Sequence, residues 1–151
     1  MTKILVVYHS QSGNTHRAAE YVAEGIESVE GKQAVMKAAL DAGVEELLEC
    51  DGICLGTPDY FSYMAGGLKD FFDRTFYPAR GKVTGKPCGI FVTHGGGGKP
   101  AAESVERVCR SFDFRQVADP VLVLRSPDEQ ASRELISLGE TIARSCANRK
   151  E

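Results

Sequence analysis

The chain has 151 residues, with 18 Lys and Arg against 21 Asp and Glu and a net charge of −3. This length is typical of one domain, so we expect a single domain over residues 1–151, and the near balance of charge without a basic stripe argues against a nucleic-acid partner. No apolar run approaches the roughly 18 residues that span a bilayer, which predicts a cytoplasmic protein without membrane insertion.

Short apolar runs alternate with segments of helical period along the chain. This alternation predicts strand-helix units around a parallel sheet that is buried on both faces. The expected strands lie at residues 4–8, 33–37, 52–56, 88–93 and 121–124. Apolar stripes at helical spacing place four helices at residues 18–29, 44–48, 64–76 and 105–112.

A fifth helix is expected after the last strand. Ser126-Pro127-Asp128-Glu129 has the pattern of a capping box, with Ser126 as the N-cap and Pro127 at the first helical position. Leu135, Leu138 and Ile142 would form its buried side. Five cysteines are scattered without a Cys-x-x-Cys pattern, so we expect reduced core residues and no metal site.

Five such units without a long insertion predict an open, doubly wound three-layer α/β sandwich. In this architecture ligands bind beyond the carboxyl ends of the strands, where the strand order reverses. The functional residues are therefore expected in the loops at 9–15, 57–64 and 93–99.

The first loop, at residues 9–15, reads His-Ser-Gln-Ser-Gly-Asn-Thr and leads directly into a helix. A helix N-terminus offers unsatisfied N–H donors at its positive dipole end, and small residues let the chain wrap around a phosphate. Because the loop contains no Lys or Arg, neutral donors would hold that phosphate. An ordinary Ser- or Thr-capped helix start is the alternative interpretation.

The second loop is rich in aromatic residues, with Tyr60, Phe61 and Tyr63 in it. These side chains could stack on a flat ring system, and the alternatives are that they fold back onto the core or form a dimer contact. The third loop contains four consecutive glycines at residues 95–98, which would let backbone approach a planar ligand closely. A flexible connector is the alternative there.

The sequence lacks both Gly-x-Gly-x-x-Gly and Gly-x-x-x-x-Gly-Lys-Ser/Thr, which argues against a Rossmann dinucleotide site and an NTPase. It instead resembles the flavodoxin-like FMN proteins. Residues 10–15 match the Thr/Ser-x-Thr/Ser-Gly-x-Thr phosphate loop of that family. The pattern Gly-Thr-Pro-x-Tyr-Phe-x-x-Met at residues 56–64, followed by residues 68–75, is similar to the second flavin loop of NAD(P)H:quinone and FMN reductases.

The resemblance implies a flavodoxin-like three-layer sandwich with a five-stranded parallel sheet in the order 2-1-3-4-5. It also implies an FMN site. The phosphate would contact Ser10, Ser12, Gly13, Asn14 and Thr15. The isoalloxazine ring would lie between Pro58, Asp59, Tyr60, Phe61 and Ser62 on one side and Thr93, His94, Gly95, Gly96 and Gly97 on the other.

The function implied by the resemblance is an FMN oxidoreductase that accepts electrons from NAD(P)H and passes them to a quinone or similar acceptor. His94 is the candidate catalytic residue, since a cation near the N1/O2 edge of a flavin stabilises its anionic reduced form. A loop histidine bonded to backbone is the alternative. Arg74, Arg80, Lys82 and Lys86 are expected to be charges of a solvated loop, with attraction of the 2′-phosphate of a nucleotide as the alternative.

Two further functions remain open at this stage. Electron-carrier flavodoxins are strongly acidic and carry carboxylates and an aromatic residue in the third loop, whereas this chain has His94 and glycines, which favours a reductase. A carrier reduced by a partner protein is the second hypothesis, and an FMN-binding regulatory module is the third. By analogy with the family we expect a homodimer.

Overall fold

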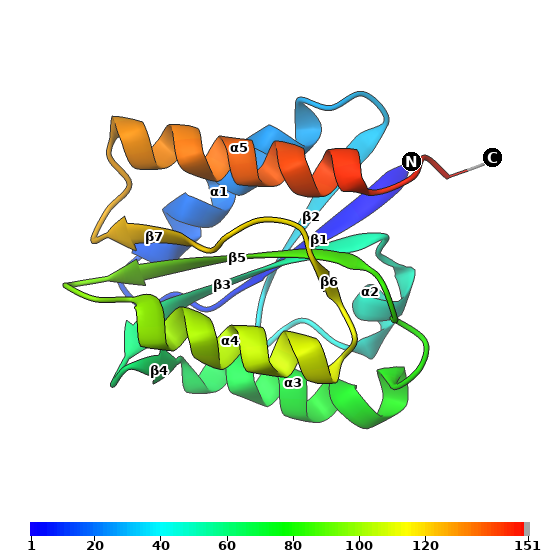
Figure 1. Cartoon of the computed structure of the whole chain (residues 1–151), viewed down its shortest axis with the longest axis horizontal. Coiled ribbons are helices and arrows are strands. Elements are labelled where there is room, and N and C mark those ends of the chain that lie inside the picture. The colour runs from blue at the N-terminus through cyan, green and yellow to red at the C-terminus, as the bar shows by residue number, and fades with distance from the viewer. Residues whose placement is uncertain (150–151) are drawn as a thin grey trace.

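The computed structural model describes residues 1–149 and has a central sheet between two layers of helices (Figure 1). In chain order its elements are β1 (Thr2–Tyr8), α1 (Asn14–Glu27), β2 (Lys32–Ala38), α2 (Val44–Glu49), β3 (Gly52–Tyr60), β4 (Tyr63–Met64), α3 (Gly66–Ala79), β5 (Pro87–His94), α4 (Lys99–Ser111), β6 (Arg115–Gln116), β7 (Val121–Leu124) and α5 (Glu129–Ser145).

The parallel strands follow the order β2-β1-β3-β5-β6, and β7 also pairs with β5. The fifth strand of the expected sheet is therefore split in two. β6 lies beside the start of β5, at Pro87, and β7 lies beside its end, where Leu124 is opposite His94. This confirms the flavodoxin-like sandwich and the expected order 2-1-3-4-5, with β6 and β7 together taking the fifth place.

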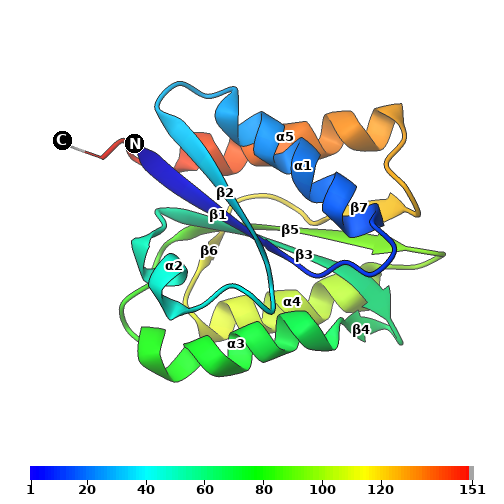
Figure 2. The same ribbon diagram turned by 180° about the vertical axis from the view of Figure 1, so that it is seen from behind.

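Helices cover both faces of the sheet, as Figure 2 shows from behind. Successive side chains of a strand point to opposite faces, so Ile4 and Val6 of β1 pack under α1 and α5, while Leu5 and Val7 pack against the layer of α2, α3 and α4. All five cysteines are buried and free, as expected of core thiols. Within residues 1–149, no helix has the length and apolarity that a membrane span requires.

The third helix begins later than the sequence indicates. Its apolar stripe appeared to start at Met64, but Met64 pairs with Asp59 in a short antiparallel hairpin of β3 and β4, and α3 begins at Gly66. The backbone N–H of Met64 donates to the Ser104 hydroxyl of α4, 3.1 Å away. Tertiary hydrogen bonding therefore holds this residue in a strand, although its spacing suits the helix that follows.

The fifth helix also begins two residues later than expected. Asp128, not Ser126, is the N-cap, because its Oδ1 accepts a hydrogen bond from the backbone N–H of Ala131 at 2.8 Å. A carboxylate directly before the first helical residue competes well for this cap. The Ser126 hydroxyl is thereby free of the capping role and accepts a hydrogen bond from Arg17 Nε of α1 at 3.3 Å.

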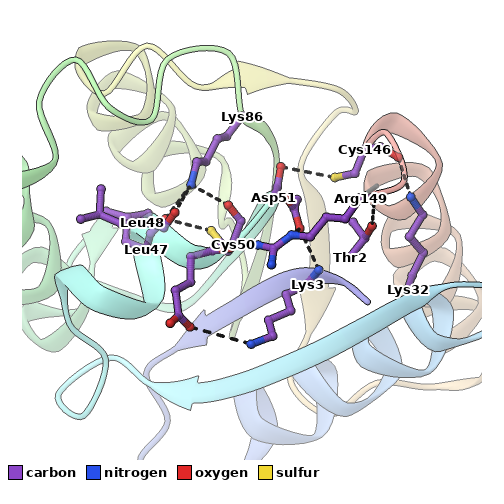
Figure 3. A network of polar contacts seen from close by, with 11 residues as sticks. Thr2, Lys3, Lys32, Leu47, Leu48, Cys50, Asp51, Lys86, Cys146 and Arg149 are labelled. Carbon is purple, nitrogen blue, oxygen red and sulfur yellow. Dashed lines mark hydrogen bonds and ion pairs between the residues drawn. The ribbon is translucent and has the colours of Figure 1, made fainter. Parts of the chain in front are cut away.

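A polar network lies at the amino ends of the strands (Figure 3). The Lys86 ammonium donates to the carbonyls of Leu47, Leu48 and Cys50 at the C-terminal end of α2. The buried Lys32 ammonium donates in the same way to the Cys146 carbonyl after α5, at 2.6 Å. Both cations complement the negative ends of helix dipoles.

These contacts argue against the alternative that Arg74 and Lys86 attract a nucleotide phosphate. Lys86 is committed to the end of α2, and Arg74 is bonded to Asp70 and to two backbone carbonyls of the loop at residues 39–42. Arg80 and Lys82 follow the C-terminal end of α3. Arg80, Lys82 and Lys86 lie toward the amino ends of the strands, because α3 runs from the carboxyl edge to the opposite one, whereas Arg74 is held against the loop that follows β2.

Candidate functional site

The loop between β1 and α1 is braced by the hydroxyl of Ser10. Its oxygen accepts hydrogen bonds from the backbone N–H groups of Gly13, at 3.1 Å, and His16, at 3.3 Å. Gly13 is the N-cap of α1 with φ of 97°, a left-handed conformation that favours glycine. Ser10 therefore shapes the loop from within, and its neighbours Ser12 and Asn14 line the cleft at the carboxyl edge of the sheet.

A buried pair of hydroxyls joins the first loop to the third. Thr15 Oγ1 lies 2.7 Å from Thr93 Oγ1, and both residues are almost fully buried. A hydroxyl has one donor and two acceptor positions, so Thr15 can accept from Thr93 and still donate to a ligand oxygen. The pair fixes the N-terminus of α1 against the end of β5.

The second loop is a tight hairpin between β3 and β4. Its central residues, Phe61 and Ser62, have φ of 57° and 61°, the pattern of a type I′ turn. Tyr60, one residue earlier, lines the cleft and contacts the ring of His9 edge to face, with 6.3 Å between ring centroids. Phe61 is 103% exposed at the tip of the turn, so Tyr60 faces the cleft and Phe61 does not.

Asp59 ties this hairpin to the third loop. Its Oδ1 accepts a hydrogen bond from the N–H of Ser62 at 2.9 Å, and its Oδ2 accepts one from the N–H of Gly98, the N-cap of α4, at 3.1 Å. The first turn of α4 has no acidic residue and its N-cap has no side chain. Asp59 therefore supplies, from another strand, the anion that a helix N-terminus favours.

The third loop keeps its backbone bare and open. Gly96, Gly97 and Gly98 all have positive φ, at 146°, 139° and 87°. A Cβ on Gly98 would lie 2.8 Å from the His94 ring, whereas a Cβ on Gly95 or Gly96 would meet nothing within 4 Å. Glycine is thus required at residue 98 by conformation and by packing, and the loop leaves open space beside residues 95 and 96.

The Nδ1 atom of His94 is buried and has no hydrogen-bond partner among residues 1–149. Buried polar atoms are nearly always satisfied, so this nitrogen calls for a partner outside the protein chain. His94 lies at the end of β5, at the edge where Leu124 of β7 is its neighbour. His94 is consequently the residue at this edge whose side chain most lacks a hydrogen-bond partner.

The three loops enclose a shallow cleft of about 210 Å³. Its lining residues are Gln11, Ser12, Asn14, Thr15, Pro58, Asp59, Tyr60, Thr93, His94, Gly95 and Arg125. Of the expected site residues, Ser10, Gly13, Phe61, Ser62, Gly96 and Gly97 lie in the same loops but outside this lining. A larger groove of about 470 Å³ between β7 and α5 lies away from these loops, so the smaller cleft is the candidate site.

Two arginines belong to this region, although the sequence pointed to other cations. Arg125 lines the cleft from the turn after β7, and Arg17 reaches back from α1 to Asn14 and Ser126. The turn at residues 125–128 is thus a fourth loop of the site. Two signals could have located them: Arg17 lies one helical turn after Asn14, and Arg125 directly follows the last strand of a parallel sheet.

The architecture and the three loops define a flavodoxin-like protein. A solved flavodoxin from the domain Archaea superposes with a TM-score of 0.84 at 30% sequence identity, covering 95% of this chain and 97% of that one. The model of the family described as NADPH-dependent FMN reductase matches residues 29–127, more than half of the chain. The chain therefore belongs to the NADPH-dependent FMN reductase family, as the sequence resemblance indicated.

Curated relatives include both functional types. A flavodoxin of Aquifex aeolicus is 34% identical over 117 residues, covering 76% of this chain and 63% of the relative. An NAD(P)H dehydrogenase (quinone) of Geobacter sulfurreducens is 33% identical over 122 residues, covering 62% of this chain and 60% of the relative. The chain thus spans somewhat less than two thirds of the length of these relatives.

The residues of the cleft fit an FMN group. The N-terminus of α1 with Ser12 and Thr15 offers N–H and hydroxyl donors for a phosphate, and the unpartnered His94 Nδ1 offers a polar atom for a ring heteroatom. Tyr60 supplies an aromatic wall. This agrees with the family to which the chain belongs, and the expectation of an FMN cofactor is confirmed at the level of the family.

Proposed function

We propose that this chain is an FMN-dependent oxidoreductase that accepts electrons from NAD(P)H and passes them to a quinone or a similar small acceptor. The observation that carries the proposal is the open third loop. No side chain projects from residues 95–98, and the space beside Gly95 and Gly96 is empty of protein. A planar donor or acceptor could therefore approach a ring bound in the cleft.

The residues divide into a phosphate end and a ring end. Ser12, Asn14 and Thr15 would hold the phosphate with neutral donors, helped by the dipole of α1. Tyr60 and His94 would hold the ring, with Tyr60 packed on His9 and therefore restricted in orientation. When bound, FMN supplies the electron-transfer chemistry, because it exchanges two electrons with nicotinamides and with quinones.

His94 has the role of a hydrogen-bonding group at the ring. Its Nδ1 is buried without a partner in the part of the chain that the structure describes, so a hydrogen bond with a ligand would satisfy a polar atom that the protein leaves unpaired. A Cβ at residue 98 would lie 2.8 Å from the same ring, so the position of the imidazole depends on glycine at the N-cap of α4.

A second function, an electron carrier reduced by a partner protein, is favoured by the likeness to the archaeal and Aquifex aeolicus flavodoxins. The two functions differ in whether a nicotinamide nucleotide reduces the bound flavin directly. The open third loop favours direct reduction, since carriers exchange electrons with proteins at the ring edge and need no space for a second planar ring.

The deciding experiment is an anaerobic titration of the FMN-loaded protein with NADPH and, separately, with NADH, followed by the visible flavin absorbance. We expect one nucleotide to bleach the oxidised flavin band on the timescale of a turnover assay. A quinone added afterwards should restore the band. Free FMN at the same concentration gives the background rate. A band that neither nucleotide bleaches, but that dithionite does, would exclude the reductase and favour the carrier.

A further inference from the structure

Arg17 is positioned over the first loop by three features of the structure. Its guanidinium donates to the Asn14 side-chain oxygen and, through Nε, to the Ser126 hydroxyl at 3.3 Å. A Cβ on Gly13 would lie 3.2 Å from the guanidinium, so glycine at residue 13 leaves this side chain room. Arg17 therefore folds back toward the N-terminus of its own helix.

This position is electrostatically unfavourable without an anion. A cation beside the positive end of a helix dipole is repelled by it, and the first turn of α1 contains no acidic residue. In the part of the chain that the structure describes, Arg17 forms no ion pair with a carboxylate, and neither does Arg125. Positive charge is thus gathered at one side of the cleft and left uncompensated by the protein.

Arg125 is brought to the cleft by a strained turn. Its φ is 57°, a left-handed value that is unusual for a residue other than glycine or asparagine. Its backbone N–H donates to the His94 carbonyl at 2.7 Å, which ties the fourth loop to the third. Backbone strain of this kind persists where the surroundings fix it, and it is frequent at ligand sites.

We propose that Arg17 and Arg125 form a cationic rim that makes the cleft select ligands carrying a phosphomonoester dianion. The inference rests on the proposed FMN site and adds two residues outside its phosphate loop. A guanidinium binds phosphate oxygens through paired N–H donors and keeps its charge at all physiological pH values. Two positive charges discriminate more strongly than neutral loop donors alone between a ligand with a phosphate group and the same ligand with a hydroxyl in its place.

The phosphomonoester could belong to FMN or to the 2′-position of NADPH. The Arg17 side chain reaches from α1 back to Asn14, in the segment proposed to hold the FMN phosphate, so we assign it to that group. Arg125 lines the cleft together with residues of both the phosphate end and the ring end. Separate measurements on the two arginines therefore show whether the phosphate that each one binds belongs to FMN or to NADPH.

The test measures dissociation constants of FMN and riboflavin, by flavin fluorescence, for the wild type, Arg17→Gln and Arg125→Asn. Asparagine is chosen at residue 125 because it tolerates the left-handed backbone. Arg133→Gln is the matched control: it removes the same charge from α5, where Arg133 pairs with Glu129 outside the cleft. The ratio of NADPH to NADH dissociation constants is measured for the same four proteins.

We expect Arg17→Gln to weaken FMN binding about three- to tenfold and to leave riboflavin binding unchanged, as removal of one partly exposed charge contact predicts. Arg125→Asn should change either the FMN to riboflavin ratio or the NADPH to NADH ratio by a similar factor. The control should change neither. The wild-type preference for FMN should also fall as salt concentration rises.

The rim is overturned if both variants keep both ratios at the wild-type value, or if riboflavin binding falls in parallel with FMN binding. These results are separate from the fate of the proposed reductase. A protein that prefers FMN through its arginines, but whose bound flavin no nucleotide reduces, would retain the inference and lose the reductase. A wild type that binds neither flavin would overturn both.

Discussion

The hydroxyl oxygens of Thr15 and Thr93 lie 2.7 Å apart in the core, joining loops that are 78 residues apart in the chain. Their contact holds the start of α1 against the end of β5. The proposed phosphate end and the proposed ring end of the cleft are therefore linked through one buried hydrogen bond.

We expect Thr93→Val to lower the free energy of unfolding by about 1–3 kcal/mol, since it leaves the Thr15 hydroxyl buried without a partner. Valine keeps the branched shape, so little packing is lost. The double variant Thr15→Val/Thr93→Val should be no less stable than the single one, because both polar groups are then gone. Urea unfolding of the wild type, Thr15→Val, Thr93→Val and the double variant gives the coupling energy between the two hydroxyls. Strictly additive effects would show that the hydroxyls act independently.

A second expectation concerns Asp59. Asp59→Ala should cost about 1–2 kcal/mol, because the N-terminus of α4 loses its cap, and amide exchange at Gly98 should accelerate. FMN affinity should fall as the two ring-side loops separate. Asp128→Ala is the control, since it removes an equivalent cap from α5 outside the cleft. Equal loss of FMN affinity in both variants would show that general destabilisation, not the position of Asp59, is responsible.

Gly98→Ala should be destabilising by about 1–2 kcal/mol from its left-handed backbone alone, and the contact with the His94 ring adds to this. Gly66→Ala is the comparison. Gly66 begins α3 and a Cβ there meets nothing within 4 Å, so alanine should be neutral or stabilising by roughly 0.5 kcal/mol. Thermal denaturation of both variants measures the difference in stability between them. This difference would vanish if the N-cap of α4 were not in a left-handed conformation.

The hairpin separates the roles of two neighbouring aromatic residues. Tyr60→Ala should weaken FMN binding by about 1 kcal/mol through lost ring contact, because Tyr60 lines the cleft. Phe61→Asn should leave FMN binding unchanged and stabilise the protein by up to about 1 kcal/mol, since asparagine suits the left-handed turn. Fluorescence titration and urea unfolding report the two effects. Weakened FMN binding in Phe61→Asn would show that the tip of the hairpin closes over the flavin.

Stability at alkaline pH should depend on Cys50. Burial raises the pKa of its thiol to about 11 from the ordinary value of 9.0. The unfolded chain therefore loses this proton first, and the stability of the native state falls as the pH rises from about 9 to 11, by at most roughly 3 kcal/mol. Cys50→Ala should flatten this part of the profile of unfolding free energy against pH. An unchanged slope would assign the alkaline loss to other groups.

The order of the elements could be predicted from the sequence, and three loops could be proposed as the site, because both depend on local patterns. Apolar runs of strand length at residues 4–8 and 88–93 can be buried on two faces in only a few ways, and parallel strands bring their following loops to one edge. The phosphate loop at residues 10–15 is recognisable for the same reason, since its capping residues and the helix it begins are adjacent in the chain.

Details that depend on distant partners could not be predicted in this way. The helical spacing of Met64 conceals a strand, because its backbone N–H bonds to Ser104, 40 residues away. Ser126 has the sequence pattern of an N-cap, but Asp128 takes that position. Tyr60 and Phe61 are equivalent in the sequence, and only the left-handed turn directs one into the cleft and the other into solvent.

The fold, the family and three loops of the candidate site follow from the amino-acid sequence alone, because they depend on hydrophobic period and on residues close together in the chain. The folded arrangement sets which charges reach the candidate site. Lys86 is held at the amino ends of the strands, whereas Arg125 lines the cleft and Arg17 bonds to the neighbouring residue, Ser126. Long cationic side chains reach across several elements, so their destinations are set by folded geometry and not by their order in the chain.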